Sequence, residues 1–250
     1  MKTYPLRTRF ARDIVTEFRV PLRLSRRVII LCDGMPSVPS PSRLLDFFWK
    51  KGYWVFRLRY RGTWESGGRF LARSPHEDIL AVIDGLRKSF VSIADKRKFT
   101  VTPEHIFIIG QSFGGTAAIL SLLDARVDKV VALSPVVDWK APSKVESLDW
   151  LYYFVREGFG EGYRFRFEDW RKLISGKFFN PQAHVRDIDG SKLMILHARD
   201  DNVVLFGPVK RFAQRVGCEL MLLKRGGHAQ SSWLLQKRIY RHVRGFLLHT

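Results

Sequence analysis

The chain has 250 residues, of which 46% are hydrophobic, and this size and composition fit a single α/β domain with a sizeable core. The formal net charge is +19, but the sequence has no RNA-recognition, KH or zinc-finger signature, no secretory leader and no apolar run of ~18 residues that would cross a bilayer. We therefore expect a cytoplasmic protein with no specific nucleic-acid partner and no transmembrane segment, whose basic surface could still touch anionic surfaces.

Strand and helix patterns alternate along most of the chain. Strands are expected over 28–32, 53–60, 105–110, 129–133, 192–198 and 218–224. Helices are expected over 42–52, from Pro75, over 115–124, over 209–216 and over 235–246. Residues 10–24 add less regular edge strands. This alternation predicts a mostly parallel central sheet flanked by helices on both faces.

One long segment, 136–190, does not fit the alternation. Twelve of the 33 aromatic residues lie between Trp139 and Phe179, about double the share that the length of this stretch would give. We predict a short helical cap, inserted late in the sheet of one domain that spans 1–250. The aromatic side chains have two candidate roles, to line a substrate pocket or to form the core of the cap itself. We predict that three of them contact substrate: Trp150, Tyr153 and Phe154.

The two cysteines, Cys32 and Cys218, both lie in strand-like apolar runs. Buried thiols are typical of such positions in a reducing compartment. We therefore predict two free thiols rather than a disulfide.

The stretch Gly110-Gln111-Ser112-Phe113-Gly114 has the pattern G-x-S-x-G, which is weak evidence by itself. Its position between a predicted strand and a predicted helix is the setting that a nucleophile elbow requires. Small residues on both sides leave room for a strained turn that presents the Ser112 hydroxyl at a helix N-terminus. The alternative is a glycine-rich turn without chemistry.

A serine hydroxyl needs a base and a carboxylate that orients the base. Of seven histidines, His228 is the best candidate because it lies in a Gly-rich loop directly after the last strand. Asp201 follows the preceding strand and is our choice of acid, with Asp200 and Asp138 as alternatives. The chain order Ser112, Asp201, His228 belongs to one of three unrelated triad arrangements.

These stretches resemble the α/β-hydrolases, particularly the prolyl-oligopeptidase-like and small carboxylesterase branches, from about Val28 to Leu248. The resemblance implies a nucleophile at Ser112, an acid at Asp201 and a base at His228. "CDGMP" matches the oxyanion stretch of the family, which implies a hole formed by the backbone amides of Met35 and Phe113. The histidine usual in that stretch is replaced by Asp33.

The resemblance also covers "RGTWESGG", residues 61–68, as the loop after the fourth strand. Two interpretations fit this loop. In one, Arg61 and Glu65 touch the substrate. In the other, which we favour, the glycines and the packing of Trp64 hold the loop in place.

The sequence thus predicts a serine hydrolase that cleaves a carboxylic ester through an acyl-enzyme intermediate, with no cofactor and no metal. The expected substrate is a small-molecule ester or a short peptide with an apolar moiety. Alternatives are a serine peptidase of the prolyl-oligopeptidase-like type and an acyltransferase. A non-catalytic binding protein is a further alternative, because a fold alone does not fix a function.

Overall fold

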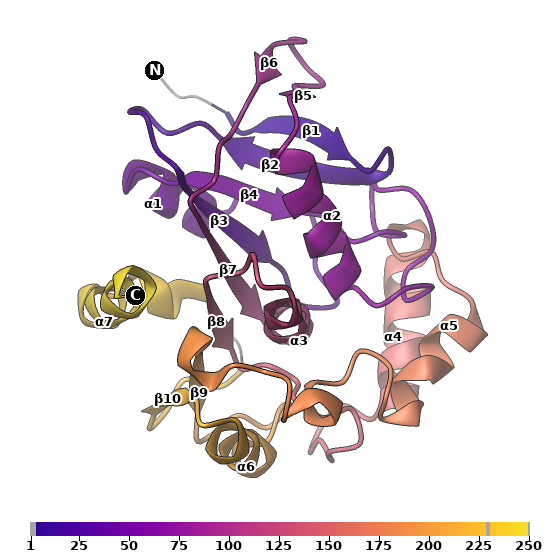
Figure 1. Cartoon of the computed structure of the whole chain (residues 1–250). Helices are drawn as coiled ribbons and strands as arrows, with labels where there is room; N and C mark the ends of the chain where they lie inside the picture. The colour runs from indigo at the N-terminus through magenta and orange to yellow at the C-terminus, as the bar shows by residue number, and fades with distance from the viewer. Residues whose placement is uncertain (1–3, 229–230, 250) are drawn as a thin grey trace.

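Eight strands form one mixed, mostly parallel sheet at the centre of the computed structural model, which describes residues 4–228 and 231–249 (Figure 1). The strand order is β1-β2-β4-β3-β7-β8-β9-β10. The first two strands form an antiparallel hairpin, and β2 pairs antiparallel with β4. All other neighbours in the sheet are parallel. The mostly parallel sheet is therefore as predicted, and residues 10–24 contribute to its antiparallel edge.

The strands and helices have the following bounds. The strands of the sheet are β1 (Leu6–Phe10), β2 (Ile14–Arg19), β3 (Arg27–Cys32), β4 (Trp54–Leu58), β7 (His105–Gln111), β8 (Lys129–Leu133), β9 (Leu193–Ala198) and β10 (Glu219–Leu223). A separate antiparallel pair consists of β5 (Phe90–Val91) and β6 (Lys98–Phe99). The α-helices are α1 (Arg43–Lys50), α2 (His76–Leu86), α3 (Phe113–Leu120), α4 (Leu148–Phe159), α5 (Phe167–Arg171), α6 (Phe206–Val216) and α7 (Lys237–Leu248).

The central strands are apolar on both faces because both faces are covered. Along β3, Val28 and Ile30 enter one core cluster, whereas Ile29 and Leu31 enter the other. Helices α2, α3 and α6 contribute to the first cluster, and α1 and α7 to the second. Successive side chains of a strand point to opposite faces, so a continuous apolar run feeds two cores at once.

The segment between β8 and β9, which contains the predicted cap at 136–190, is mainly helical. It includes α4 and α5, which Figure 1 draws on the opposite side of the view from α7. Helix α4 begins after Ser147, whose hydroxyl accepts a hydrogen bond from the Trp150 N–H at 3.1 Å. Its buried residues are Leu151, Tyr152 and Val155, so one face of α4 packs inward.

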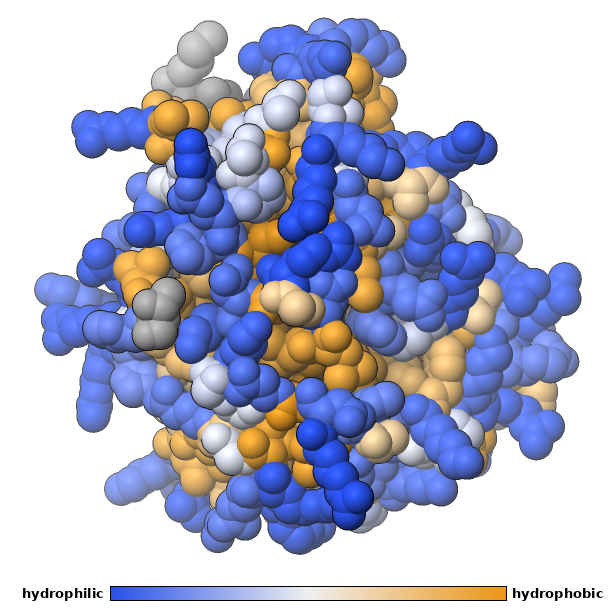
Figure 2. All heavy atoms as spheres, viewed as in Figure 1, coloured by the Kyte–Doolittle hydropathy of each residue, from blue (hydrophilic) through white to orange (hydrophobic). Residues whose placement is uncertain are grey.

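Charged residues are spread along the chain rather than gathered in one run. Figure 2 shows hydrophilic side chains over most of the face seen in Figure 1, around a hydrophobic area near its middle. Among the described residues, no helix is both long and apolar enough to cross a membrane.

Both cysteines are free, as predicted. Cys32 ends β3, and Cys218 directly precedes β10, with β7, β8 and β9 between these two strands. Burial raises the pKa of both thiols, and it raises that of Cys218 to about 12.

We therefore predict that thiol titration of the denatured, unreduced protein counts two free thiols. The native protein should react slowly with the same reagent, because the thiolate is the reactive form and burial disfavours it. A count of zero in denaturant would contradict the separation of Cys32 from Cys218 in the sheet.

Candidate active site

Ser112 occupies a strained turn between the end of β7 and the start of α3. Its backbone has φ 52° and ψ −119°, a conformation that non-glycine residues rarely adopt. The Ser112 N–H donates to the Leu133 carbonyl at 2.8 Å, which fixes the turn to the end of β8. The turn therefore presents the serine side chain at the carboxyl edge of the sheet.

The glycines on either side of Ser112 are required by close backbone approaches. A Cβ atom at Gly110 would lie 2.1 Å from the carbonyl oxygen of Gly114. A Cβ atom at Gly114 would lie 2.2 Å from the carbonyl oxygen of Cys32, at the end of β3. The G-x-S-x-G pattern thus reflects the contact of α3 with two neighbouring strand ends.

The three residues predicted as a triad form one continuous chain of hydrogen bonds. The Ser112 hydroxyl lies 2.9 Å from Nε2 of His228, and Nδ1 of the same ring lies 2.9 Å from Oδ2 of Asp201. Because a carboxylate only accepts, the ring donates from Nδ1 to Asp201, which leaves Nε2 free to accept from Ser112. This is the tautomer in which a histidine can remove a proton from a serine.

Asp201 is buried, and both of its carboxylate oxygens accept hydrogen bonds. Its Oδ1 accepts the N–H groups of Val203 and Val204, both at 2.9 Å. Burial raises the pKa of Asp201, but the hydrogen bond and charge of His228 and the Val204 N–H outweigh it, so the pKa lies below its ordinary value. Asp201 is therefore ionised at neutral pH and can stabilise a protonated His228 ring.

His197 lies close to this carboxylate and is completely buried. Its Nε2 donates to the Val204 carbonyl at 2.9 Å and lies 3.7 Å from Oδ2 of Asp201. Burial lowers the pKa of His197, so the ring is neutral. It supports the loop that carries Asp201 without adding a charge.

The two alternative acids have other partners. Oδ1 of Asp200 accepts the N–H groups of Gly226 and Gly227 at 2.9 and 3.0 Å, so Asp200 holds the loop that leads to His228. Asp138 accepts from the side-chain amide of Asn180 at 3.2 Å.

The loop after β3 passes close to Ser112. A Cβ atom at Gly34 would lie 3.4 Å from Cβ of Ser112, and Met35 and Phe113 border the same cavity as Ser112. Phe113 is the first residue of α3, and the first N–H groups of a helix have no intrahelical acceptor. Both residues predicted for the oxyanion hole thus lie beside the serine.

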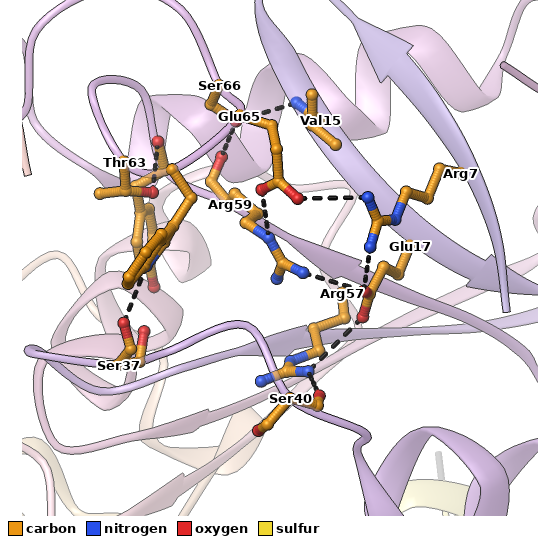
Figure 3. Close-up of polar contacts among 12 residues, drawn as sticks. Arg7, Val15, Glu17, Ser37, Ser40, Arg57, Arg59, Thr63, Glu65 and Ser66 are labelled. Carbon is orange, nitrogen blue, oxygen red and sulfur yellow. Dashed lines mark hydrogen bonds and ion pairs between the residues drawn. The ribbon is translucent and has the colours of Figure 1, made fainter. Parts of the chain in front are cut away.

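Buried charges hold this loop from the side of the sheet. Arg57 of β4 is 5% exposed. It donates to Oδ2 of Asp33 at 2.7 Å and to the Ser40 carbonyl at 2.6 Å, so it holds the loop near both of its ends. Figure 3 shows Arg57 beside Glu17 of β2, which also pairs with Arg59 at 2.8 Å.

A second set of contacts ties the middle of the loop to the segment between β8 and β9. The Ser37 N–H donates to the hydroxyl of Tyr163 at 2.8 Å, and Trp64 Nε1 donates to the Ser37 carbonyl at 2.8 Å. The Trp64 ring packs against Gly162. No local pattern in the sequence marks Tyr163 or Arg57, because their contacts with the loop join distant parts of the chain.

The loop at 61–68 is held in part by a glycine, as we favoured, since a Cβ atom at Gly62 would lie 1.9 Å from the backbone nitrogen of Phe70. Ion pairs with residues outside the loop also hold it. Arg61 pairs with Asp13 and Asp78, and Glu65 pairs with Arg7 and Arg59. Arg61 and Glu65 are absent from the described lining of the cavity beside Ser112.

The cavity beside Ser112 has a volume of about 410 Å³. Its lining is largely apolar, which is typical of small-molecule sites. The lining combines the strand ends with the segment between β8 and β9, and includes Val136, Val137, Trp139, Leu148, Leu151, Val203 and Val204.

The structure does not bring Trp150, Tyr153 and Phe154 to this cavity. They are 46%, 64% and 42% exposed and lie on the outer face of α4. The helical period turns Leu151 inward and these three side chains outward, which aromatic content alone does not reveal. The aromatic residue of this segment that lines the cavity is Trp139.

The sheet order and the turn at Ser112 define an α/β-hydrolase fold, as predicted. The chain matches the model of the prolyl oligopeptidase family over residues 40–250 and belongs to that family. It is a serine hydrolase. No curated protein sequence matches the chain.

Solved structures of esterases and of a peptidase have the same fold. The esterase Pf2001 of Pyrococcus furiosus is 18% identical with a TM-score of 0.69, and the match covers 98% of this chain and 89% of that one. Est1E of Butyrivibrio proteoclasticus, solved with ferulic acid bound, is 15% identical with a TM-score of 0.66, covering 98% and 100%. The acylaminoacyl peptidase of Pyrococcus horikoshii is 17% identical with a TM-score of 0.63, covering 97% of this chain and 40% of the peptidase.

Substitution of Gly114 tests the backbone contact behind the serine. We expect Gly114→Ala to lower the free energy of unfolding by about 1–3 kcal/mol or more, because the new methyl group meets backbone atoms of Cys32 and Asp33 that have little room to move. Urea denaturation measures this change.

Gly158→Ala in α4 is the matched control, because its Cβ atom would be 3.9 Å from the nearest side chain. This variant should be neutral or slightly stabilising. Equal stability of the Gly114 and Gly158 variants would contradict the close approach of α3 to the end of β3.

Proposed function

We propose that the protein hydrolyses carboxylic esters through an acyl-enzyme intermediate on Ser112. The observation that carries this proposal is the chain of hydrogen bonds from Ser112 through His228 to Asp201, with both distances at 2.9 Å. A serine hydroxyl becomes an effective nucleophile when an adjacent base accepts its proton.

The reaction proceeds in two halves. Ser112 Oγ attacks the ester carbonyl carbon while His228 Nε2 takes the hydroxyl proton, and the ring then gives this proton to the departing alcohol. Water attacks the acyl group on Ser112 and passes a proton to His228, which returns it to the serine oxygen as the acid leaves. Asp201 stays ionised throughout and stabilises the imidazolium.

The amides of Met35 and Phe113 are proposed to stabilise the negative oxygen of the tetrahedral intermediates. Two features support this role. Both residues border the cavity beside Ser112, and the contacts of Arg57 and Tyr163 fix the loop that carries Met35. Fixed donors are effective because they need not reorganise as charge develops.

The lining of the cavity favours a substrate with an apolar moiety. We propose that Trp139, Leu148 and Leu151 contact this moiety in place of the three outward-facing aromatic residues. Binding of ferulic acid, an aromatic acid, by Est1E agrees with a substrate of this class. A peptidase activity is the second candidate, favoured by membership of the prolyl oligopeptidase family.

Replacement of the nucleophile is the first test. Ser112→Ala should fold normally and lose ester hydrolysis by several orders of magnitude, because nucleophile and base act as a unit. Activity is measured with p-nitrophenyl esters of increasing acyl length and with aminoacyl p-nitroanilides. Activity near that of the unmodified protein would refute the mechanism, whereas Ser112-dependent cleavage of anilides alone would favour the peptidase.

A ranking of three carboxylates tests the acid. Asp201→Asn should lower kcat far more than Asp138→Asn, because only Asp201 is bonded to His228. Asp200→Asn retains a side-chain oxygen that can accept from Gly226 and Gly227, so its effect should be small. A reversed ranking, measured on the same ester, would assign the acid to another residue.

A further inference from the structure

The cavity beside Ser112 differs in charge from the rest of the molecule. The chain carries 43 lysines and arginines against 24 aspartates and glutamates. Yet the ionisable side chains in the described lining are two carboxylates, Asp138 and Glu146, and no lysine, arginine or histidine is among them. A strongly basic protein thus has an acidic, otherwise apolar cavity next to its proposed nucleophile.

Glu146 is held close to the proposed catalytic residues by backbone contacts. The Lys144 N–H donates to the Asn202 carbonyl at 3.1 Å, and the Ser143 hydroxyl donates to the same carbonyl at 3.4 Å. The Glu146 N–H in turn donates to the Ser143 hydroxyl at 3.0 Å. Since Asn202 directly follows Asp201, these bonds fasten the segment with Glu146 to the loop of the proposed acid.

The two carboxylates of the cavity differ in their partners. Oδ1 of Asp138 accepts from the Asn180 side chain at 3.2 Å and from the Lys140 N–H at 3.1 Å, so Asp138 stabilises its own loop. The carboxylate of Glu146 has neither a hydrogen-bond donor nor an ion-pair partner among the residues that the structure describes. Burial raises the pKa of Glu146, the charge of His228 lowers it and that of Asp201 raises it, with a net rise.

We propose that Glu146 recognises a positively charged nitrogen on the substrate. The preferred substrate is then an ester that combines an apolar chain with an ammonium group, and this inference rests on the proposed hydrolysis at Ser112. A bound cation supplies the counter-charge that Glu146 lacks. Trp139 borders the same cavity, and an aromatic residue there adds a favourable environment for a cation.

The positive net charge of the protein excludes long-range attraction as the cause of a preference for a cationic ester. A surface with an excess of 19 positive charges repels a cationic substrate at long range. At 0.15 M ionic strength this repulsion is screened beyond ~8 Å. A preference for the cation can therefore arise only from groups close to the bound substrate.

A second role for Glu146 must be separated from substrate recognition. Its charge also interacts with that of His228, so it could stabilise the protonated ring during the reaction. That effect would act on every ester alike. Recognition of a cation, in contrast, affects only substrates that carry one.

The experiment compares pairs of esters that have the same shape and differ in charge. On the acyl side, the pair is the p-nitrophenyl esters of 5-(trimethylammonio)pentanoate and of 6,6-dimethylheptanoate. On the alcohol side, the pair is butyrylthiocholine and 3,3-dimethylbutyl thiobutyrate. We expect kcat/KM to be higher by about tenfold for the cationic member of at least one pair, which corresponds to ~1.4 kcal/mol.

The variant Glu146→Gln should abolish this ratio, because it should lower kcat/KM for the cationic ester more than for the neutral one. Glu157→Gln is the matched control, because it removes the same charge from an exposed position of α4 that is not in the described lining. The control should keep the ratio. Thermal unfolding checks that both variants are folded.

Three outcomes would overturn the inference. Equal kcat/KM within both pairs would exclude a cation site. If Glu146→Gln lowers kcat/KM equally for both members of a pair, Glu146 acts by stabilising the protonated ring of His228. A ratio that persists in Glu146→Gln would place recognition elsewhere. If Ser112→Ala hydrolyses the neutral esters as well as the unmodified protein does, the proposed function itself is wrong, so the two failures are distinguishable.

Discussion

The close approach of the start of α3 to the end of β3 is the constraint on which the rest of the site depends. Gly114 lies against the Cys32 carbonyl, and Gly110 lies against Gly114, so three backbone segments meet without side chains between them. This contact forces Ser112 into its strained conformation and brings the loop after β3 past the serine. The surrounding sheet stabilises the strained turn, because the Ser112 N–H is also hydrogen-bonded to the end of β8.

The sequence predicts those parts of the site that follow directly from the order of strands. Ser112, Asp201 and His228 each come after an apolar strand, and parallel strands bring such loops to one edge of a sheet. Their hydrogen bonds follow from topology and residue type. The sheet and its flanking helices are predictable for the same reason, since a continuous apolar run such as that of β3 is typical of a strand buried on both faces.

Features that depend on helix orientation and long-range contacts are not visible in the sequence. An aromatic cluster in α4 suggests a pocket, but both faces of this helix carry aromatic residues, with Tyr152 buried and Tyr153 exposed. The hydroxyl of Tyr163 reaches Ser37 across more than a hundred positions of the chain. Glu146 lies in a polar stretch like many others, and only the hydrogen bonds of the neighbouring Ser143 and Lys144 to Asn202 show that it lies beside the site.

Asp33, where the family resemblance implies a histidine, takes part in a cluster of ion pairs beside β2 and β4. The cluster has three positive charges, from Arg7, Arg57 and Arg59, and three negative ones, from Glu17, Glu65 and Asp33. Figure 3 labels all of these residues except Asp33. A neutral histidine at position 33 would leave this cluster with an excess positive charge and would remove the ion pair between Arg57 and Asp33. The position of the loop that carries Met35 is therefore linked to the charge balance of two strands. Substitution of Glu17 on β2 would therefore alter the loop beside Ser112, because Glu17 pairs with Arg57 and Arg57 holds Asp33.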